Sequence, residues 1–246
     1  MRLVLEIENG SRVSAKEAFV LTAKLKLRAV LLPLPSLAAE PAELAEGEAG
    51  RLRQAASRAG VTIAGLTGVM AGTEHRLVGG DTSRAAALAR LQATVRLCTE
   101  LGARLMCFGL PNWELLRSKL RPDQARMLAA EVLRRCGPLA ESRRVTLCVS
   151  ISDAGSAEKL VRKVDHPNIR LACDGAALKH LAQPVRDVRL ARACLGDNPE
   201  TLGKLLSALD YSHWLSLRLG GNETDAAALS AWLKTFRSAG GFTAEV

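Results

Sequence analysis

The chain has 246 residues, a formal net charge of +9, 48% hydrophobic residues and only 3% aromatic residues. This length and composition allow one sizeable domain with a core of Leu, Ala and Val. No apolar run approaches the roughly 20 residues that a membrane span needs. The opening MRLVLEIENG carries acids inside its short apolar run, which is not the pattern of a secretory signal peptide. We therefore expect a cytoplasmic protein with no membrane partner, whose six cysteines are free thiols.

Along the chain, short apolar segments alternate with Ala-, Leu- and Arg-rich segments of helical period. The segments predicted as strands are 2–8, 29–34, 61–67, 104–110, 145–151, 169–174, 189–195 and 214–219. The segments most clearly predicted as helices are 83–103, 121–144, 198–210 and 222–240. Pro138 predicts a kink or break in the second helix. Asn198 followed by Pro199 predicts the N-cap and first residue of the third.

This alternation predicts an α/β fold. Eight strands separated by helices imply a parallel sheet, and eight such units in one domain imply a closed (β/α)8 TIM barrel. We expect one domain over residues 1–246. The alternative is an open doubly wound sheet. However, no G-x-G-x-x-G follows an early strand and no G-x-x-x-x-G-K-[ST] occurs, so the usual nucleotide-binding forms of that sheet lose their main support.

Several segments of this chain resemble segments of one protein family. They are RLRQAASRAGVTIAGL (51–66), ARLQATVRLCTELGARLMCFG (89–109), LAESRRVTLCVS (139–150), VDHPNIRLACD (164–174) and LSALDYSHWLSLRL (206–219). They resemble helices and strands of the xylose-isomerase-like TIM barrels. This superfamily includes sugar isomerases and epimerases, inosose dehydratases and the endonuclease IV type of DNA-repair enzyme. The resemblance implies a site at the carboxyl-terminal mouth of the barrel, where members usually hold one or more divalent cations.

The resemblance also indicates where the ligands of that cation should stand. Only Asp174, at the end of the sixth strand, has the usual residue type. The other positions carry Ser150 for a Glu, Ala177 for a His, Arg192 and Cys194 for His-x-His, and Arg218 for a Glu. Arginine cannot become a ligand and repels a cation. We therefore expect no metal and no other cofactor. Arginine charge would replace the metal charge, and Asp174 would pair with Arg218.

Other residues near the expected mouth have two interpretations each. Glu6 and Glu8 end the first strand on one face, and Glu8 is either a general base or part of a rim salt bridge. Trp113, after the fourth strand, either stacks on a ligand or caps the mouth. His180, after the sixth strand, is either a ligand-binding residue or a solvated helix position.

The cysteines also have two interpretations. Cys107, Cys148, Cys173 and Cys194 fall on four successive strands and either fill the barrel interior or form a nucleophile or soft metal site. The filling role is favoured. Cys194 stands apart because the nearby Arg192 would lower its pKa.

Three functions remain open from the sequence. The first is a divergent, metal-independent sugar isomerase or epimerase that binds a small anionic ligand, either a sugar phosphate or a sugar acid. In it, Arg192, Arg218, Ser150, Trp113, Cys194 and His180 would bind the ligand, and Asp174 and Glu8 would be catalytic. The second is a non-catalytic barrel that acts as a binding or scaffold protein. The third is a conventional metal-dependent isomerase or endonuclease whose ligands are misassigned here.

The partners follow from the same observations. The arginines are spread over many helices without a dense run, which argues against a dedicated nucleic-acid groove despite the positive charge. The expected partner is a small anionic molecule. A homo-oligomer stays open, because the sequence does not fix the oligomeric state.

Overall fold

The computed structural model describes residues 1–44, 47–109, 120–150, 154–180, 188–194, 196–219 and 226–240. Its strands are parallel and close into one barrel in the order β1 to β8. The strands are β1 (Arg2–Ile7), β2 (Ala29–Pro33), β3 (Thr62–Thr67), β4 (Leu105–Gly109), β5 (Thr146–Ser150), β6 (Ile169–Asp174), β7 (Val188–Cys194) and β8 (Trp214–Leu219). The predicted (β/α)8 barrel is confirmed.

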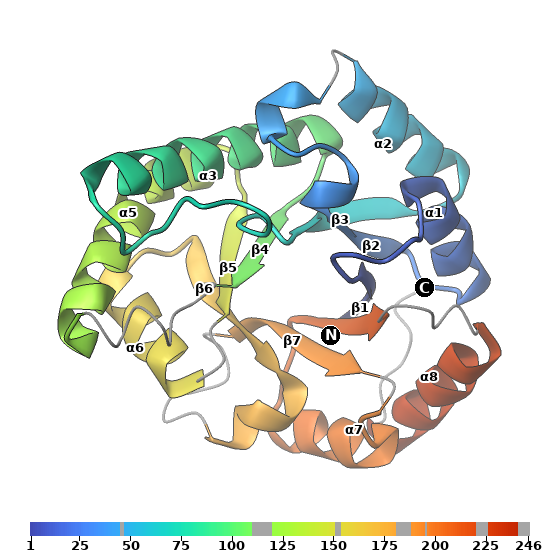
Figure 1. Cartoon of the computed structure of the whole chain (residues 1–246). Helices are drawn as coiled ribbons and strands as arrows, with labels where there is room; N and C mark the ends of the chain where they lie inside the picture. The colour runs from blue at the N-terminus through green and yellow to red at the C-terminus, as the bar shows by residue number, and fades with distance from the viewer. Residues whose placement is uncertain are drawn as a thin grey trace.

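The helices lie around the strands as an outer ring (Figure 1). They are α1 (Ala15–Lys24), α2 (Glu48–Arg58), α3 (Asp81–Leu101), α5 (Pro122–Ser142), α6 (Ala154–Val164), α7 (Pro199–Ala208) and α8 (Ala226–Gly240), with the short 3-10 helices η1 (Leu34–Ser36), η2 (Pro41–Glu43) and η3 (Gly175–His180). Asn198 caps α7 as predicted, its side chain accepting a hydrogen bond from the Thr201 N–H. In the described residues, no helix combines the length and apolar character needed to cross a membrane.

Of the kink or break predicted at Pro138, the break is wrong. Helix α5 runs through this residue from Pro122 to Ser142. Proline removes one intrahelical hydrogen bond. The buried side chains of Leu133, Cys136 and Ala140 continue the packed face of α5 on both sides of Pro138, and this packing holds the helix together.

Side chains alternate between two apolar layers along each strand. The larger layer packs between strands and helices. The smaller fills the barrel interior and consists of Val4, Ala29, Leu31, Ala64, Leu105, Cys107, Cys148, Ala172 and Leu190, with Trp214 against it. Cys107 and Cys148 therefore fill the interior, as the favoured interpretation has it. Cys173 packs in the outer layer instead, because it precedes Asp174 on β6 and neighbouring residues face opposite sides.

The described turns from a helix into the next strand share a left-handed residue one or two positions after the helix. These residues are Lys26, Gly60, Gly102, Arg144, Asp165 and Asp210, with φ between 50° and 73°. A left-handed residue at this place satisfies the last carbonyl groups of the helix and reverses the chain. The turns thus return each helix to the amino-terminal end of the barrel, while the carboxyl-terminal ends of the strands form the opposite mouth.

Candidate functional site

A cavity of about 310 Å³ lies at the carboxyl-terminal ends of the strands. This is the end at which TIM barrels place their active sites. The charged and polar side chains that line the cavity include Glu6, Glu8, Asn9, Thr67, Ser150, Arg192 and Arg218. They come from β1, β3, β5, β7 and β8 and from the residues directly after β1, so the cavity is built by strands far apart in the sequence.

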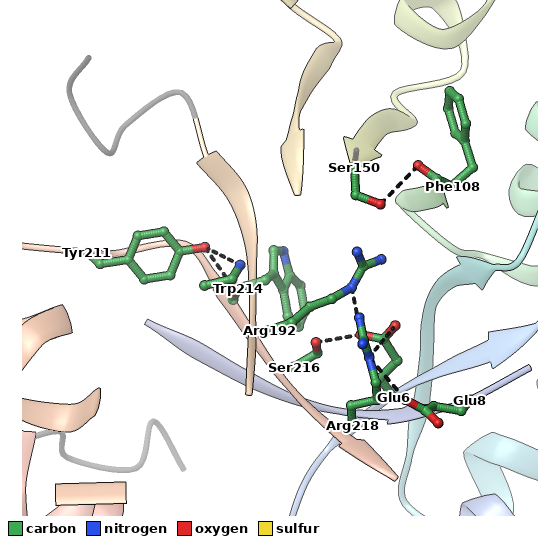
Figure 2. Close-up of polar contacts among 10 residues, drawn as sticks. Glu6, Glu8, Phe108, Ser150, Arg192, Tyr211, Trp214, Ser216 and Arg218 are labelled. Atoms are coloured by element: carbon green, nitrogen blue, oxygen red, sulfur yellow. Dashed lines mark hydrogen bonds and ion pairs between the residues drawn. The ribbon is translucent and has the colours of Figure 1, made fainter. Parts of the chain in front are cut away.

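A buried carboxylate, Glu6, lies at the centre of the polar network. The Nε of Arg192 donates to Oε2 of Glu6 at 3.2 Å, and the Ser216 hydroxyl donates to the same oxygen at 2.6 Å. All three residues are buried. Figure 2 shows them converging from β1, β7 and β8. The strand register explains why these three side chains lie together. Ser216 pairs with Arg192 on one side and with Val4 on the other. Glu6 is the next residue after Val4 on the same face of β1.

Among the described residues, Arg192 is held through the Nε side of its guanidinium only. Burial acts to lower its pKa, but the neighbouring Glu6 carboxylate raises the pKa above its ordinary value. The guanidinium is therefore permanently charged. Its terminal nitrogens point away from Glu6 and toward the side of the cavity on which Ser150 lies (Figure 2). No hydrogen bond to another described residue takes up these terminal nitrogens.

Arg218 lies beside β1. Its Nε is 3.7 Å from Oε1 of Glu6 and 3.5 Å from Oε1 of Glu8 (Figure 2). The predicted Asp174–Arg218 pair is wrong, since neither residue, both of them described, forms an ion pair with the other. Barrel closure is the reason, because β8 neighbours β1 with Arg218 opposite Glu6, whereas β7 separates β8 from β6.

Asp174 and Cys194 end their strands near this cavity. Asp174 is exposed, stands opposite Arg192 in the β6–β7 register and is not among the lining residues. Burial raises the pKa of Cys194, while the Arg218 charge acts in the opposite direction. The expected lowering of this pKa by Arg192 is therefore wrong. The acting cation is Arg218, and desolvation outweighs it.

The remaining candidates have different outcomes. The Ser150 side chain lines the cavity, and its hydroxyl donates to the Phe108 carbonyl at 3.4 Å. Trp113 lies outside the described residues. His180 ends η3, and its side chain is outside the described part.

From the sequence, Glu6 is recognisable only as a neighbour of Glu8 on one strand face, and Ser216 is not recognisable at all. The signal for Glu6 was present, since it shares a strand face with Glu8. The signal for Ser216 was not, because a serine inside an apolar strand has no distinctive pattern.

Comparison with known proteins fixes the family. Residues 19–183 match the family model described as the xylose isomerase-like TIM barrel. The chain belongs to this family. No curated protein matches the chain.

Solved structures similar to this xylose isomerase-like barrel cover nearly its whole length. D-psicose 3-epimerase from Clostridium cellulolyticum H10, crystallised with D-tagatose, is 16% identical, with a TM-score of 0.76 over 98% of this chain and 99% of that one. The 3-keto-D-glucoside 4-epimerase of E. coli is 11% identical, with a TM-score of 0.72 over 97% and 99%. AP endonuclease, family 2, from Brucella melitensis is 13% identical, with a TM-score of 0.73 over 95% and 99%. At these identities the likeness concerns the fold.

The donor groups of the described residues form no cluster of three or more His, Cys, Asp or Glu side chains that could hold a metal ion. At the cavity, the acids Glu6 and Glu8 instead face the guanidinium groups of Arg192 and Arg218.

Proposed function

We propose that this xylose isomerase-like barrel binds a small anionic sugar derivative, a sugar phosphate or a sugar acid, and isomerises or epimerises it without a divalent cation. The observation that carries the proposal is the orientation of Arg192. Glu6 fixes its Nε, so the terminal nitrogens are presented to the cavity in one geometry. A planar pair of N–H donors matches a carboxylate or phosphate and binds it in a bidentate manner.

The proposed reaction uses no divalent cation because the carboxylate oxygens of the cavity are already engaged. Oε2 of Glu6 already accepts two hydrogen bonds, and its Oε1 lies 3.7 Å from Arg218. A divalent cation needs several free oxygen or imidazole ligands. Two guanidinium groups against the same carboxylate would repel it. The described residues of this cavity therefore do not fit a divalent cation.

Proton transfer is assigned to Glu8. Isomerisation and epimerisation next to a carbonyl need a base that removes a proton and a cation that stabilises the resulting enediolate. The Glu8 side chain lines the cavity and is 38% exposed, so a ligand can reach it. Arg218, which lines the cavity 3.5 Å from Glu8, is assigned two roles: it contacts the bound anion and it stabilises the developing negative charge. Asp174, exposed at the end of β6, is the second candidate for moving a proton.

The test measures binding by EDTA-treated protein, with pairs of sugars that differ only in a phosphate or carboxylate group. Anionic members should raise the melting temperature and give a measurable Kd by calorimetry, and neutral members should not. Arg218→Gln should weaken binding by roughly tenfold or more, the typical value of one charge-assisted contact. Arg126→Gln, which removes a half-buried arginine paired with Asp123 on α5, is the matched control and should leave the Kd unchanged. Equal binding of neutral sugars, or binding only after metal is restored, would contradict the proposal.

A binding barrel without turnover is the second candidate. It is favoured by one observation, that each cavity guanidinium already faces a carboxylate. Incubation of each bound ligand in deuterated water separates the two functions. Exchange of the hydrogen next to the carbonyl, lost in Glu8→Gln, supports the enzyme. Tight binding without exchange supports the binding protein.

A further inference from the structure

We propose that the amino-terminal rim of the barrel, on the end opposite the cavity, binds the sugar–phosphate backbone of a nucleic acid. The rim carries a group of basic residues that we name the basic arc. The arc consists of Lys26, Arg28, Arg58, Arg104, Arg143 and Arg144, all of them exposed. They lie at the helix ends and turns that precede β2, β3, β4 and β5, which are consecutive neighbours in the barrel.

Hydrogen bonds link neighbouring turns of the arc, and the Arg104 N–H, which donates to the Ala64 carbonyl of β3 at 2.9 Å, joins its two halves. The Thr62 N–H, at the start of β3, donates to the Arg28 carbonyl at 2.8 Å. The Thr146 N–H, at the start of β5, donates to the Arg104 carbonyl at 2.8 Å, and Nη1 of Arg104 donates to the Arg143 carbonyl at 3.2 Å. Neighbouring strands are about 4.8 Å apart, so the arc extends over roughly 14 Å. A nucleic-acid strand carries one phosphate per about 3.4 Å of axis, so several phosphates match this length.

The charge of the arc is not neutralised locally. Among the described residues, no ion pair joins an arc residue to an acid. By contrast, Arg51 and Arg126 on the outer helix surfaces pair with acids three residues earlier. The acids nearest to the arc in sequence are Glu100 and Glu141, and Glu141 faces His166 at 3.7 Å. The positive charge of the arc therefore faces solvent.

Two arc residues share the left-handed backbone conformation of the helix-to-strand turns, which Asp165 and Asp210 also adopt. Lys26 and Arg144 have φ of 54° and 55°, a left-handed conformation that side-chain-bearing residues disfavour. The two turns between them along the rim use Gly60 and Gly102 at the same place. The carboxyl ends of helices favour nearby cations. This preference does not by itself explain why Lys26 and Arg144 occupy positions where glycine would fit the backbone better.

The composition of the arc favours nucleic acid over a lipid surface. All but one of its residues are arginine, whose planar fork matches phosphate oxygens. Membrane-surface binding usually adds large apolar side chains that enter the lipid. The exposed large hydrophobic residues of the described chain, Val20 and Met127, are not in the arc. The dispersal of the arginines along the sequence argues against a nucleic-acid groove, but the fold brings five of them, together with Lys26, onto one rim.

The test is fluorescence anisotropy with a labelled duplex DNA of arbitrary sequence, about 20 base pairs long, titrated with the full chain at several salt concentrations. The logarithm of the binding constant should fall linearly with the logarithm of salt concentration, with a slope of about −3 to −5. Arg144→Gly and Lys26→Gly should each weaken binding about five- to tenfold near 0.1 M salt and reduce the slope by about 1. Both variants place glycine in a left-handed turn, so they should fold at least as well as the parent.

The chain offers matched controls. Asp165→Gly and Asp210→Gly change the equivalent left-handed position in other turns of the same rim, but remove a negative charge. They should leave binding unchanged or strengthen it. Arg218→Gln, in the cavity, should leave it unchanged.

Equal weakening by the arginine and aspartate variants would overturn the proposal, as would loss of DNA binding in Arg218→Gln. No salt-dependent binding of the duplex, with or without binding to vesicles of phosphatidylserine and phosphatidylcholine, would also overturn it.

Discussion

The buried pair of Glu6 and Arg192 makes each residue depend on the other. Arg192→Met would leave the Glu6 carboxylate buried without its counter-charge, and we expect a loss of about 3–5 kcal/mol in the free energy of unfolding. Glu6→Gln should be destabilising for the converse reason. The double variant should lose much less than the sum of the two single losses, because no uncompensated charge remains. Urea unfolding of the four proteins measures this coupling.

Ser216→Ala is the comparison for the single and double variants of Glu6 and Arg192. It removes one neutral donor to Oε2 of Glu6 and leaves the ion pair in place. We expect a loss of about 1–2 kcal/mol. Single-variant losses that simply add in the double variant would mean that Glu6 and Arg192 do not stabilise each other, and the fixed orientation of Arg192 would lose its support.

The sequence supplied the residue types of this site but not their partners. Alternation along β1 places Glu6 and Glu8 on one face, and that could be predicted. Which of them meets Arg192 and Arg218 depends on the register between the first and last strands, which only barrel closure sets. The Asp174–Arg218 pair was wrong for this reason, since a sequence shows the order of strands but not the offsets around a closed sheet.

At the scale of elements, a bulge in β3 makes Gly65 essential. The register between β2 and β3 shifts so that Val30 pairs with Ile63 and Leu31 with Gly65. A Cβ on Gly65 would lie 2.3 Å from the Leu105 carbonyl oxygen of β4, closer than atoms can approach. Gly65→Ala should therefore lower the free energy of unfolding by more than about 2 kcal/mol through overpacking.

Gly50→Ala is the matched control. Gly50 lies on the exposed surface of α2, where an added Cβ meets no atom within 4 Å. This variant should be more stable by about 0.5–1 kcal/mol, the usual advantage of alanine over glycine in a helix. Both values come from thermal or urea unfolding followed by circular dichroism. A neutral Gly65→Ala would mean that β3 and β4 are farther apart than the structure has them.

The elements themselves could be predicted well, because apolar runs and helical periods are local signals. The predicted strands agree with the structure to within about one residue at each end. Pro138 misled the prediction because the packing that holds α5 together is a tertiary effect. Between β2 and α2, the described residues form the short 3-10 helices η1 and η2.

At the scale of the whole molecule, the fold separates charges that the sequence mixes. The formal net charge of +9 does not show where on the molecule the positive charge lies. In the structure, the cavity arginines face Glu6 and Glu8, whereas the basic arc on the opposite rim faces solvent. The same excess of arginine therefore supports two different proposals, one for each end of the barrel.

The reactivity of the cysteine thiols depends on whether the barrel stays closed. All six are free; Cys194 is half-buried and the others are buried. Burial raises the pKa of Cys98, Cys136 and Cys173 to about 12. Only Cys194 should therefore react with a disulfide reagent in the native protein. Because its pKa is also raised, its thiolate fraction at neutral pH is lower than that of an ordinary cysteine, and the reaction should accelerate as pH rises toward and beyond 9.

Counting reactive thiols with a chromogenic disulfide, in the native and in the denatured protein, tests this prediction. The native protein should show one reactive thiol, which Cys194→Ala removes, and denaturant without reductant should reveal all six. The slow reaction of the remaining thiols under native conditions then measures opening of the barrel, because the interior cysteines on β4 and β5 become accessible only when neighbouring strands separate. Rapid native reaction of several thiols would mean that the barrel opens readily. A cavity floor built on a buried Glu6–Arg192 pair could not then persist, since water would reach both charges.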